Sequence, residues 1–310
     1  METTKSKKAG DLEKKLQGHS GMVKSVSHKA GDWVVAFLCL LIIIVCVLPL
    51  VNLLARSLSS AEALVGNRVA LLPVDLNFEA YTTILTDVRY IRSLLWTAAL
   101  TVVCTLVSLF MTIVCAYPLT YENLKGRGIF NVIIIVTMYF GAGTIPTYLL
   151  LKNLNMLDTA LVLIIPSCLS VFNMIIMRSF FYGIPMSLRE SAEIDGAGPL
   201  TVLIRIYLPL STPVLATLAL FYAVGRWNGF ADALMYVRNR DLYPIQLLLY
   251  NLLNSTNSIE VAQQEGFNTP GVGETIRAAT VMFATVPILI IYPFLQKYFI
   301  TGVTLGAVKE

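Results

Sequence analysis

Apolar residues along the chain gather into six long runs separated by polar segments. The runs cover about residues 33–55, 93–117, 129–151, 159–181, 208–230 and 277–300. A helix needs about 20 apolar residues to cross the hydrocarbon core of a bilayer, and each run has that length. A buried strand would be much shorter. The pattern predicts an all-α integral membrane protein with six transmembrane helices.

The composition agrees with a membrane location. The 310 residues are 56% hydrophobic and 14% charged, whereas soluble domains are about 25% charged. The five cysteines lie within the apolar runs, and both histidines, His19 and His28, precede the first run. We therefore expect no disulfide framework, no metal site and no histidine relay within the spans. The net charge of +4 forms no basic stripe on a polar fold, which argues against a nucleic-acid partner.

Positive charge sets the expected orientation. Residues 1–31 contain seven lysines directly before the first run, and positive charge beside a span favours the cytoplasmic side. We expect residues 1–31 to form a cytoplasmic basic tail able to touch anionic lipid, followed by a first transmembrane helix at 32–56. This run is about twice as long as the core of a signal peptide, so we interpret it as a retained span. Both termini are then cytoplasmic, and residues 56–92 and 231–276 lie outside.

A charged segment, RESAEIDGAGPL at 189–200, lies between the fourth and fifth runs. Each charged side chain would cost about 2.5–3.5 kcal/mol at the centre of a bilayer, so we expect residues 182–207 to lie in the cytoplasm. Ser187 and Glu190 have the spacing of a capping box, which predicts a helix start. The Asp195-Gly196 pair predicts a turn, and Pro199 fits the first turn of a second helix.

The second helix is expected to be amphipathic. Its apolar residues recur at helical spacing, namely Leu200, Leu203, Ile204, Tyr207 and Leu208. Gly196 and Gly198 would let two backbones approach closely. An ordinary surface loop is the plain alternative, although such loops are usually shorter and less ordered. A capped helix on the surface suits the groove of a partner protein.

This segment also carries a family resemblance. The stretch ESAEIDGAGPLTVLIRIYLPLSTP at 190–213 closely resembles the signature loop of type I ATP-binding-cassette importer permeases. The matching residues are Glu190, Ala192, Asp195, Gly196, Ala197, Ile206, Pro209 and Pro213, while Ser191 replaces the usual first alanine. The sugar-importing branch is resembled by IPTYLLLKNLNMLDT (145–159), IIMRSFFYGIP (175–185), WNGFADALMYV (227–237) and GVTLGAVKE (302–310). The chain is similar to the smaller permease subunit of maltose-type importers.

The resemblance implies a type I importer permease fold, with a permease core at 90–296 and a coupling helix in the loop 182–207. That helix would dock on a cytosolic ATPase. The expected coupling residues are Arg189, Glu190, Ala192, Asp195, Gly196, Ala197 and Pro209. The expected partners are a second homologous permease subunit, two ABC ATPase subunits, an extracytoplasmic solute-binding protein and a sugar. The expected location is the bacterial cell membrane.

Other sources of energy and other chemistries find no support in the sequence. No G-x-x-x-x-G-K-[ST] motif occurs, so we expect this chain to bind no cofactor and ATP with Mg to reside on the partner ATPases. No Asp, Glu or His lies deep in a run, as an ion-coupled carrier would require. No acid–base pair or activated nucleophile is evident, so the chain is not expected to be an enzyme.

A sugar pathway calls for aromatic and amide side chains. The candidate lining residues are Tyr148, Asn173, Tyr222, Arg226, Trp227 and Asn228. Arg226 lies near the outer end of the fifth run, where it could reach interfacial water, and an acidic sugar would explain an arginine there. For Trp227, an anchor at the membrane–water interface is the stronger alternative. Residues 243–254 predict an amphipathic helix that contacts the solute-binding protein or caps the bundle.

The favoured hypothesis is therefore a permease subunit that works by alternating access and catalyses no covalent step. Two rival interpretations stay open. One is the same architecture importing another solute, such as phosphate, a peptide or a polyamine. The other is a membrane scaffold or channel outside the ATP-binding-cassette family.

Overall fold

A computed structural model describes residues 29–254 and 272–307. Most of the basic tail, residues 255–271 of the segment 231–276 and the last residues of GVTLGAVKE lie outside the described residues. The chain divides into two units, residues 1–50 and 51–310. Within the described ranges there is one isolated β-bridge and no strand, and the elements are helices. The predicted all-α class is confirmed.

Helix α2 (Lys29–Ser57) contains the first predicted span. Every side chain from Gly31 to Leu50, most of them large and apolar, is exposed within its unit. A helix that is apolar on all sides is suited to lipid or to other membrane helices rather than to water.

Helix α5 (Val88–Ala116) is the long axis of the second unit and contains the second predicted span. Its buried face carries mainly small and hydroxyl-bearing side chains three or four residues apart, including Ser93, Thr97, Cys104, Ser108 and Thr112. Its exposed face carries large apolar side chains, including Leu95, Val102, Leu106 and Phe110. Small residues allow helices in lipid to approach closely, so this inside-out pattern is typical of membrane packing.

Helices α9 (Val171–Tyr182) and α13 (Thr212–Asn228) pack on α5, and α17 (Val272–Ala307) packs on α13. They contain the predicted fifth and sixth spans and the second half of the fourth. The core of the second unit lies between these helices.

Two predicted spans are interrupted away from their ends. The run 129–151 divides into α6 (Arg127–Tyr139) and α7 (Thr144–Asn153), which are bent by 113°. Gly143, at the break, has φ +86°, a conformation that favours glycine. The run 159–181 divides into the short α8 (Leu161–Ile164) and α9. Pro166 lies between them and has no backbone N–H to continue a helix. Neither run forms a single straight helix.

Three described helices are long and apolar enough to cross a membrane, namely Gly31–Ser57, Val88–Thr120 and Val272–Ile291. The number rises to six if each of three bent helix pairs is one span. The predicted architecture of about six spans is confirmed on this count.

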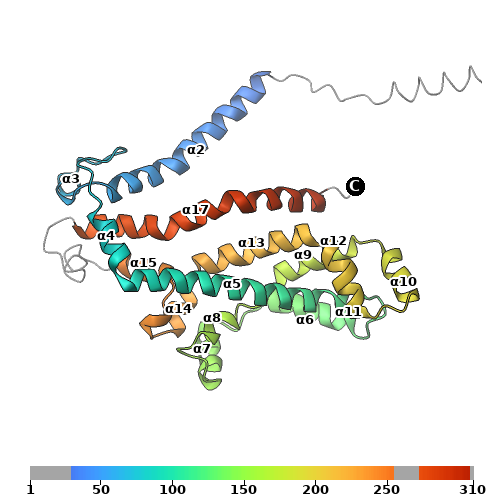
Figure 1. The fold of residues 1–310 in the computed structure, drawn as a ribbon. Coiled ribbons are helices and arrows are strands. Elements are labelled where there is room, and N and C mark those ends of the chain that lie inside the picture. Colours follow the sequence, from blue (N-terminus) through green and yellow to red (C-terminus); the bar gives the residue numbers. More distant parts are fainter. Residues whose placement is uncertain (1–28, 255–271, 308–310) are drawn as a thin grey trace, which may run out of the picture. The chain divides into compact units, whose positions relative to one another are not determined.

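The two ends of α5 carry different elements (Figure 1). Near Ala116 lie η1 (Pro118–Thr120) and a helical hairpin that begins with α10 (Met186–Ile194). The Val88 end carries short elements, namely α3 (Ala61–Val65), α4 (Glu79–Thr86), α14 (Ala231–Tyr236), η3 (Arg240–Leu242) and α15 (Ile245–Asn254). Helix α15 confirms the helix predicted over 243–254.

Candidate functional site

Residues 186–210 form a helical hairpin, referred to below as the hairpin. Helix α10 leads into a turn at 195–198. The returning arm consists of α11 (Pro199–Val202), the π-helical η2 (Leu203–Tyr207) and α12 (Leu208–Leu210). Helix α10 leaves α9 at 71°, and the arm meets α13 at 81°. The predicted sequence of helix, turn and second helix is confirmed, with Pro199 opening the arm.

The start of α10 differs from the prediction. Pro185, with φ −56°, occupies the N-cap position, and no side chain caps the helix. Ser187 therefore lies within the first turn, and its carbonyl accepts a hydrogen bond from the Ser191 hydroxyl at 2.8 Å. The capping-box prediction is wrong because proline fixes the entering φ near its helical value two residues before Ser187, the predicted start.

The apolar residues of the arm divide between two faces. Leu203 and Tyr207 are buried, whereas Leu200 is 68% and Ile204 is 53% exposed. Ile194, at the end of α10, is 85% exposed. The exposed residues lie beside the acidic side chains of α10 and its turn, Glu190, Glu193 and Asp195, which are also exposed. Exposed apolar side chains rimmed by charge are typical of a protein-docking surface.

Arg189 faces inward, unlike the other charged residues of α10. It is 8% exposed, and its guanidinium lies over the Tyr121 ring, 4.6 Å from the centroid. Its Nε is 3.7 Å from Glu193 Oε1. The Tyr117 hydroxyl bonds to that of Tyr121 at 2.7 Å and donates to the Pro199 carbonyl at 3.0 Å. Both arms of the hairpin are thus connected to the end of α5, and Arg189 serves that connection rather than the outer surface.

The turn of the hairpin depends on one glycine. Gly196 has φ +82°, whereas Gly198 has φ −72°. A Cβ atom at either glycine would meet nothing within 4 Å, so neither lies against another backbone among the described residues. The expected close approach of a partner's backbone stays a prediction. The Ala197 N–H donates to the Ala192 carbonyl at 2.9 Å and closes α10. Both alanines are half-buried, while Pro209 is exposed in the arm.

A second candidate site is a cavity of about 290 Å³ between α5, α9 and α13. It brings together three predicted pathway residues, Asn173, Tyr222 and Arg226, with serines and Cys104. The Tyr222 hydroxyl bonds to Thr112 Oγ1 at 2.7 Å and accepts the Ser170 N–H at 3.2 Å. The cavity is therefore lined by polar groups held in place from three helices.

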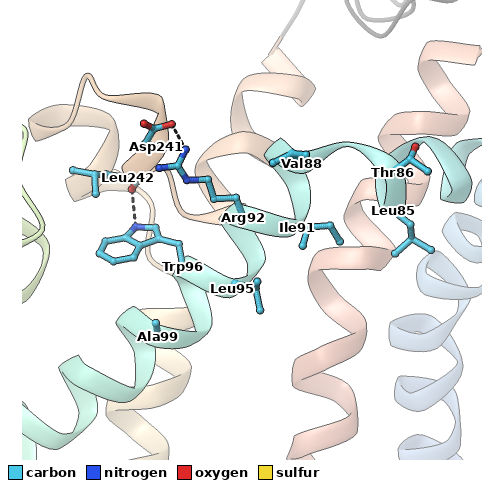
Figure 2. A pocket seen from close by; sticks show the side chains of 10 residues that line it. All are labelled: Leu85, Thr86, Val88, Ile91, Arg92, Leu95, Trp96, Ala99, Asp241 and Leu242. Carbon is cyan, nitrogen blue, oxygen red and sulfur yellow. Dashed lines mark hydrogen bonds and ion pairs between the residues drawn. The ribbon is translucent and has the colours of Figure 1, made fainter.

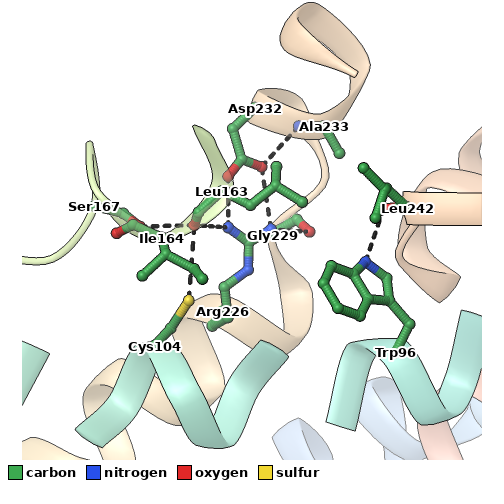
Figure 3. Close-up of polar contacts among 10 residues, drawn as sticks. All are labelled: Trp96, Cys104, Leu163, Ile164, Ser167, Arg226, Gly229, Asp232, Ala233 and Leu242. Carbon is green, nitrogen blue, oxygen red and sulfur yellow. Dashed lines mark hydrogen bonds and ion pairs between the residues drawn. The ribbon is translucent and has the colours of Figure 1, made fainter. Parts of the chain in front are cut away.

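Arg226 and the groups that it binds, Asp232 and the carbonyls of Leu163 and Gly229, form a buried cluster beside this cavity, called the bracket below (Figure 3). Nη1 and Nη2 of Arg226 bond to the two carboxylate oxygens of Asp232 at 2.5 and 3.1 Å. They also donate to the carbonyls of Leu163 and Gly229, both at 3.2 Å. The side chain is only 7% exposed, so the expectation that Arg226 reaches interfacial water is wrong. Its charge is neutralised by Asp232 and does not stand free for a ligand.

The Leu163 carbonyl connects the bracket to the broken span. It lies in α8, just before the break at Pro166, and accepts hydrogen bonds from Arg226, Ser167 Oγ at 3.2 Å and Cys104 Sγ at 3.7 Å. Side chains from α5 and α13 thus meet at the end of α8.

The other three predicted pathway residues lie elsewhere. Tyr148, on α7, stacks on Tyr236 with centroids 6.2 Å apart. Trp227 is 7% exposed and donates to the Ala284 carbonyl at 3.2 Å, so it packs against α17 and the expected interface anchor is wrong. The Asn228 side chain is exposed and donates to the Val224 carbonyl of its own helix at 3.0 Å.

Sequence reasoning missed two partners. Tyr121, which lies under Arg189, is distant in sequence and gives no local signal. Asp232 could have been found, because a buried arginine in an apolar run needs a counter-ion and Asp232 is the first acidic residue after Arg226. Within 29–254 and 272–307, no three His, Cys, Asp or Glu side chains gather as a metal site would require.

Comparison with known proteins decides the family. Residues 105–305 match the family described as binding-protein-dependent transport system inner membrane component. The chain belongs to this family. It is thus a multi-pass permease of the inner membrane, in a family whose ATPases are separate subunits.

Relatives of this permease match it over nearly their whole length. The polygalacturonan/rhamnogalacturonan transport system permease protein of Bacillus subtilis (strain 168) is 39% identical over 286 residues, 92% of this chain and 100% of the relative. The arabinooligosaccharides transport system permease protein of Halalkalibacterium halodurans is 28% identical over 90% of this chain and 96% of the relative. A crystal structure of a bacterial ABC transporter for import of the acidic polysaccharide alginate contains a similar chain. It has a TM-score of 0.81 and 33% identity and covers 89% of this chain and 98% of that chain.

Proposed function

We propose that this permease and a second, homologous permease form the translocation pathway of an ATP-driven importer for oligosaccharides or polysaccharide fragments. The relatives named for polygalacturonan/rhamnogalacturonan and arabinooligosaccharides, and the similar chain of the alginate importer, support the sugar class. Two cytosolic ATPase subunits would hold ATP and Mg, and an extracytoplasmic solute-binding protein would deliver the sugar.

The observation that carries the proposal is the hairpin. It bends away from α9 and α13 and presents Glu190, Ile194 and Asp195 on an exposed surface. A rigid helix with an apolar tip and charged neighbours suits a groove in another protein. We therefore assign the hairpin to the contact with an ATPase subunit. The hairpin end of α5 is then cytoplasmic, the Val88 end is extracytoplasmic, and both chain termini are cytoplasmic.

Alternating access would follow from the way the hairpin is attached. When ATP binding draws the two ATPases together, they move α10, and the contacts of Arg189 and Pro199 transmit that movement to the end of α5. Because α5 runs the length of the unit, its rotation changes the cavity lined by Asn173 and Tyr222. Hydrolysis resets the helices, and the permease itself makes and breaks no covalent bond.

The test is transport by the complete importer in proteoliposomes, comparing the wild type with Glu190→Lys. The side chain of Glu190 is exposed and makes no hydrogen bond or ion pair within the described ranges. Reversing its charge should therefore leave the permease folded and disturb the docked ATPase. Glu62→Lys is the matched control, because it reverses an exposed carboxylate at the opposite end of α5. We expect Glu190→Lys alone to abolish uptake and the stimulation of ATP hydrolysis by the binding protein.

Two outcomes would overturn the proposal. Full uptake and full stimulation in Glu190→Lys would remove the coupling role. A wild-type complex that transports phosphate, peptide or polyamine but no oligosaccharide would remove the sugar class while leaving the coupling role intact.

A further inference from the structure

The extracytoplasmic end of α5 contains a polar hollow that the pathway above does not use. It measures about 420 Å³ and lies among α5, η3 and α15. Three arginines line it, Arg89, Arg92 and Arg240, together with one carboxylate, Asp241, and the polar residues Tyr243 and Asn251. Its volume falls within the usual range of small-ligand pockets, about 300–1,000 Å³. A concave shape of this size fits part of a small molecule better than it fits a flat protein face.

Two of the three arginines that line the hollow have carboxylate partners, and the third does not. Arg89 bonds to Asp87 at 2.5–3.1 Å, and Arg92 bonds to Asp241 (Figure 2). The guanidinium of Arg240, an exposed residue, makes no hydrogen bond or ion pair within residues 29–254 and 272–307. Among the lining arginines, Arg240 is thus the one whose guanidinium has no partner among the described residues. A planar guanidinium of this kind matches a carboxylate in geometry and charge.

The segment that carries Arg240 is fixed in place. The carboxylate of Asp158 accepts the N–H groups of Arg238 and Asn239 at 2.9 and 2.7 Å. Beyond Arg240, Trp96 Nε1 donates to the Leu242 carbonyl, and the Ile245 N–H donates to Thr97 Oγ1, both at 2.8 Å. Preorganised donors bind with less loss of conformational entropy than mobile ones.

The Arg92–Asp241 pair also divides this hollow from an apolar one. The apolar hollow measures about 730 Å³ and shares Val88, Arg92 and Asp241 with the polar hollow. Its further lining includes Ile91 and Leu95 of α5 (Figure 2). Arg92 is 54% exposed and Asp241 55% exposed, so water screens their attraction. A carboxylate from outside can therefore compete with Asp241 for Arg92 as well as occupy Arg240.

We propose that the hollow beside Arg240 is an anion-binding site that receives a uronate carboxylate of an acidic oligosaccharide before it enters the pathway. The inference rests on the proposed sugar import and narrows its substrate class to acidic glycans. Tyr243 supplies an aromatic face for the apolar side of a sugar ring, and Asn251 supplies an amide for its hydroxyls. The alginate importer, which carries a similar chain, imports an acidic polysaccharide, in agreement with this class.

The test measures glycan binding to the complete permease–ATPase complex in nanodiscs, without the binding protein. The probes are a trigalacturonate and a neutral galactose trisaccharide of the same length. Arg240→Gln should weaken trigalacturonate binding about two- to fivefold, the range set by exposed ion pairs. Asp241→Asn removes the competing carboxylate and should strengthen it by a similar factor. The matched control is Arg238→Gln, an exposed arginine outside the hollow lining, and it should bind as the wild type does. Neutral trisaccharide binding should be equal in all four proteins.

Three outcomes would overturn the site. Arg240→Gln could bind trigalacturonate as well as Arg238→Gln does, or Asp241→Asn could fail to strengthen it. Alternatively, Arg240→Gln could lower only the affinity of the complex for its solute-binding protein, in which case the hollow is a protein-docking surface. Uptake separates this failure from that of the proposed function. If the wild-type complex imports oligosaccharides and Arg240→Gln imports them equally at low concentration, only the site is lost.

Discussion

The guanidinium of Arg189 lies 4.6 Å from the centroid of the Tyr121 ring and connects the hairpin to the end of α5. Arg189 is one of two buried charged side chains among the described residues with measured burial, and the other is Arg226. Together with the bond from the Tyr117 hydroxyl to the Pro199 carbonyl, this contact is expected to carry movement of the hairpin to the end of α5.

Removing the Arg189–Tyr121 contact should weaken coupling more than it weakens the fold. A cation–π contact contributes about 0.5–2 kcal/mol, so Arg189→Met and Tyr121→Leu should each leave the permease folded. Both variants should lower binding-protein-stimulated ATP hydrolysis. The loss in the double variant should be little larger than the loss in either single variant, because the two residues act through one contact. The measurement is a double-mutant cycle on stimulated hydrolysis. Arg205→Gln, an exposed hairpin arginine, is the control. Fully additive losses would contradict a shared contact.

The turn glycines should respond differently to the same substitution. Gly196 has φ +82°, where an L-residue costs about 1–2 kcal/mol, whereas Gly198 has an ordinary negative φ. Neither site is crowded. Gly196→Ala should therefore destabilise the hairpin and loosen the attached ATPase, while Gly198→Ala should not. Hydrogen exchange of the hairpin amides in the isolated permease checks this. Equal protection in the two variants would show that backbone conformation is not the reason for the glycine.

The Arg226–Asp232 bracket should be more sensitive to the loss of one partner than of both. Asp232→Ala leaves a buried arginine without its counter-ion, and breaking a buried pair in this way costs about 3–5 kcal/mol. The double variant Arg226→Met with Asp232→Leu removes both charges and should recover part of that loss. Thermal unfolding of the purified permease is the measurement. A double variant less stable than Asp232→Ala would show that the bonds to the Leu163 and Gly229 carbonyls outweigh the ion pair.

The Asp158 carboxylate makes the segment 238–239 sensitive to acid. Hydrogen bonds from the backbone N–H groups of Asn239 and Arg238 lower the pKa of Asp158 below its usual value. A depressed folded pKa means that the stabilisation is present above the unfolded pKa, near 4, and is lost as the pH falls through the folded pKa. We expect Asp158→Asn to be less stable than the wild type at pH 6 and the difference to shrink below pH 4. Melting temperatures at pH 3–6 test this, and a difference independent of pH would contradict it.

The sequence predicted those parts of the fold that depend on local pattern. The six apolar runs, the arm starting at Pro199 and the helix α15 each follow from periodicity or turn chemistry. The bend between α6 and α7 does not follow from such a pattern. A run of apolar residues has the same composition whether its helix is straight or bent at a glycine such as Gly143.

The candidate sites were predicted less completely, because their partners are distant in the chain. The family resemblance predicts Arg189 as a coupling residue, but nothing in the sequence indicates that Tyr121, directly after η1, holds it inward. The position of Arg226 near the outer end of its run suggests contact with interfacial water, whereas its counter-ion Asp232, beyond the end of the helix, holds it in the interior. Asn173 and Tyr222 do share a cavity, whereas Tyr148, Trp227 and Asn228 pack elsewhere.

The most direct test of the coupling role is cross-linking from the tip of the hairpin. A photoreactive amino acid at Ile194, which is 85% exposed, is illuminated in the complete importer during ATP turnover. Thr86, an exposed residue of α4 at the other end of α5, serves as the control position. The account predicts that Ile194 captures an ATPase subunit and that Thr86 does not. Capture from neither position, in an importer that still takes up oligosaccharide, would contradict it.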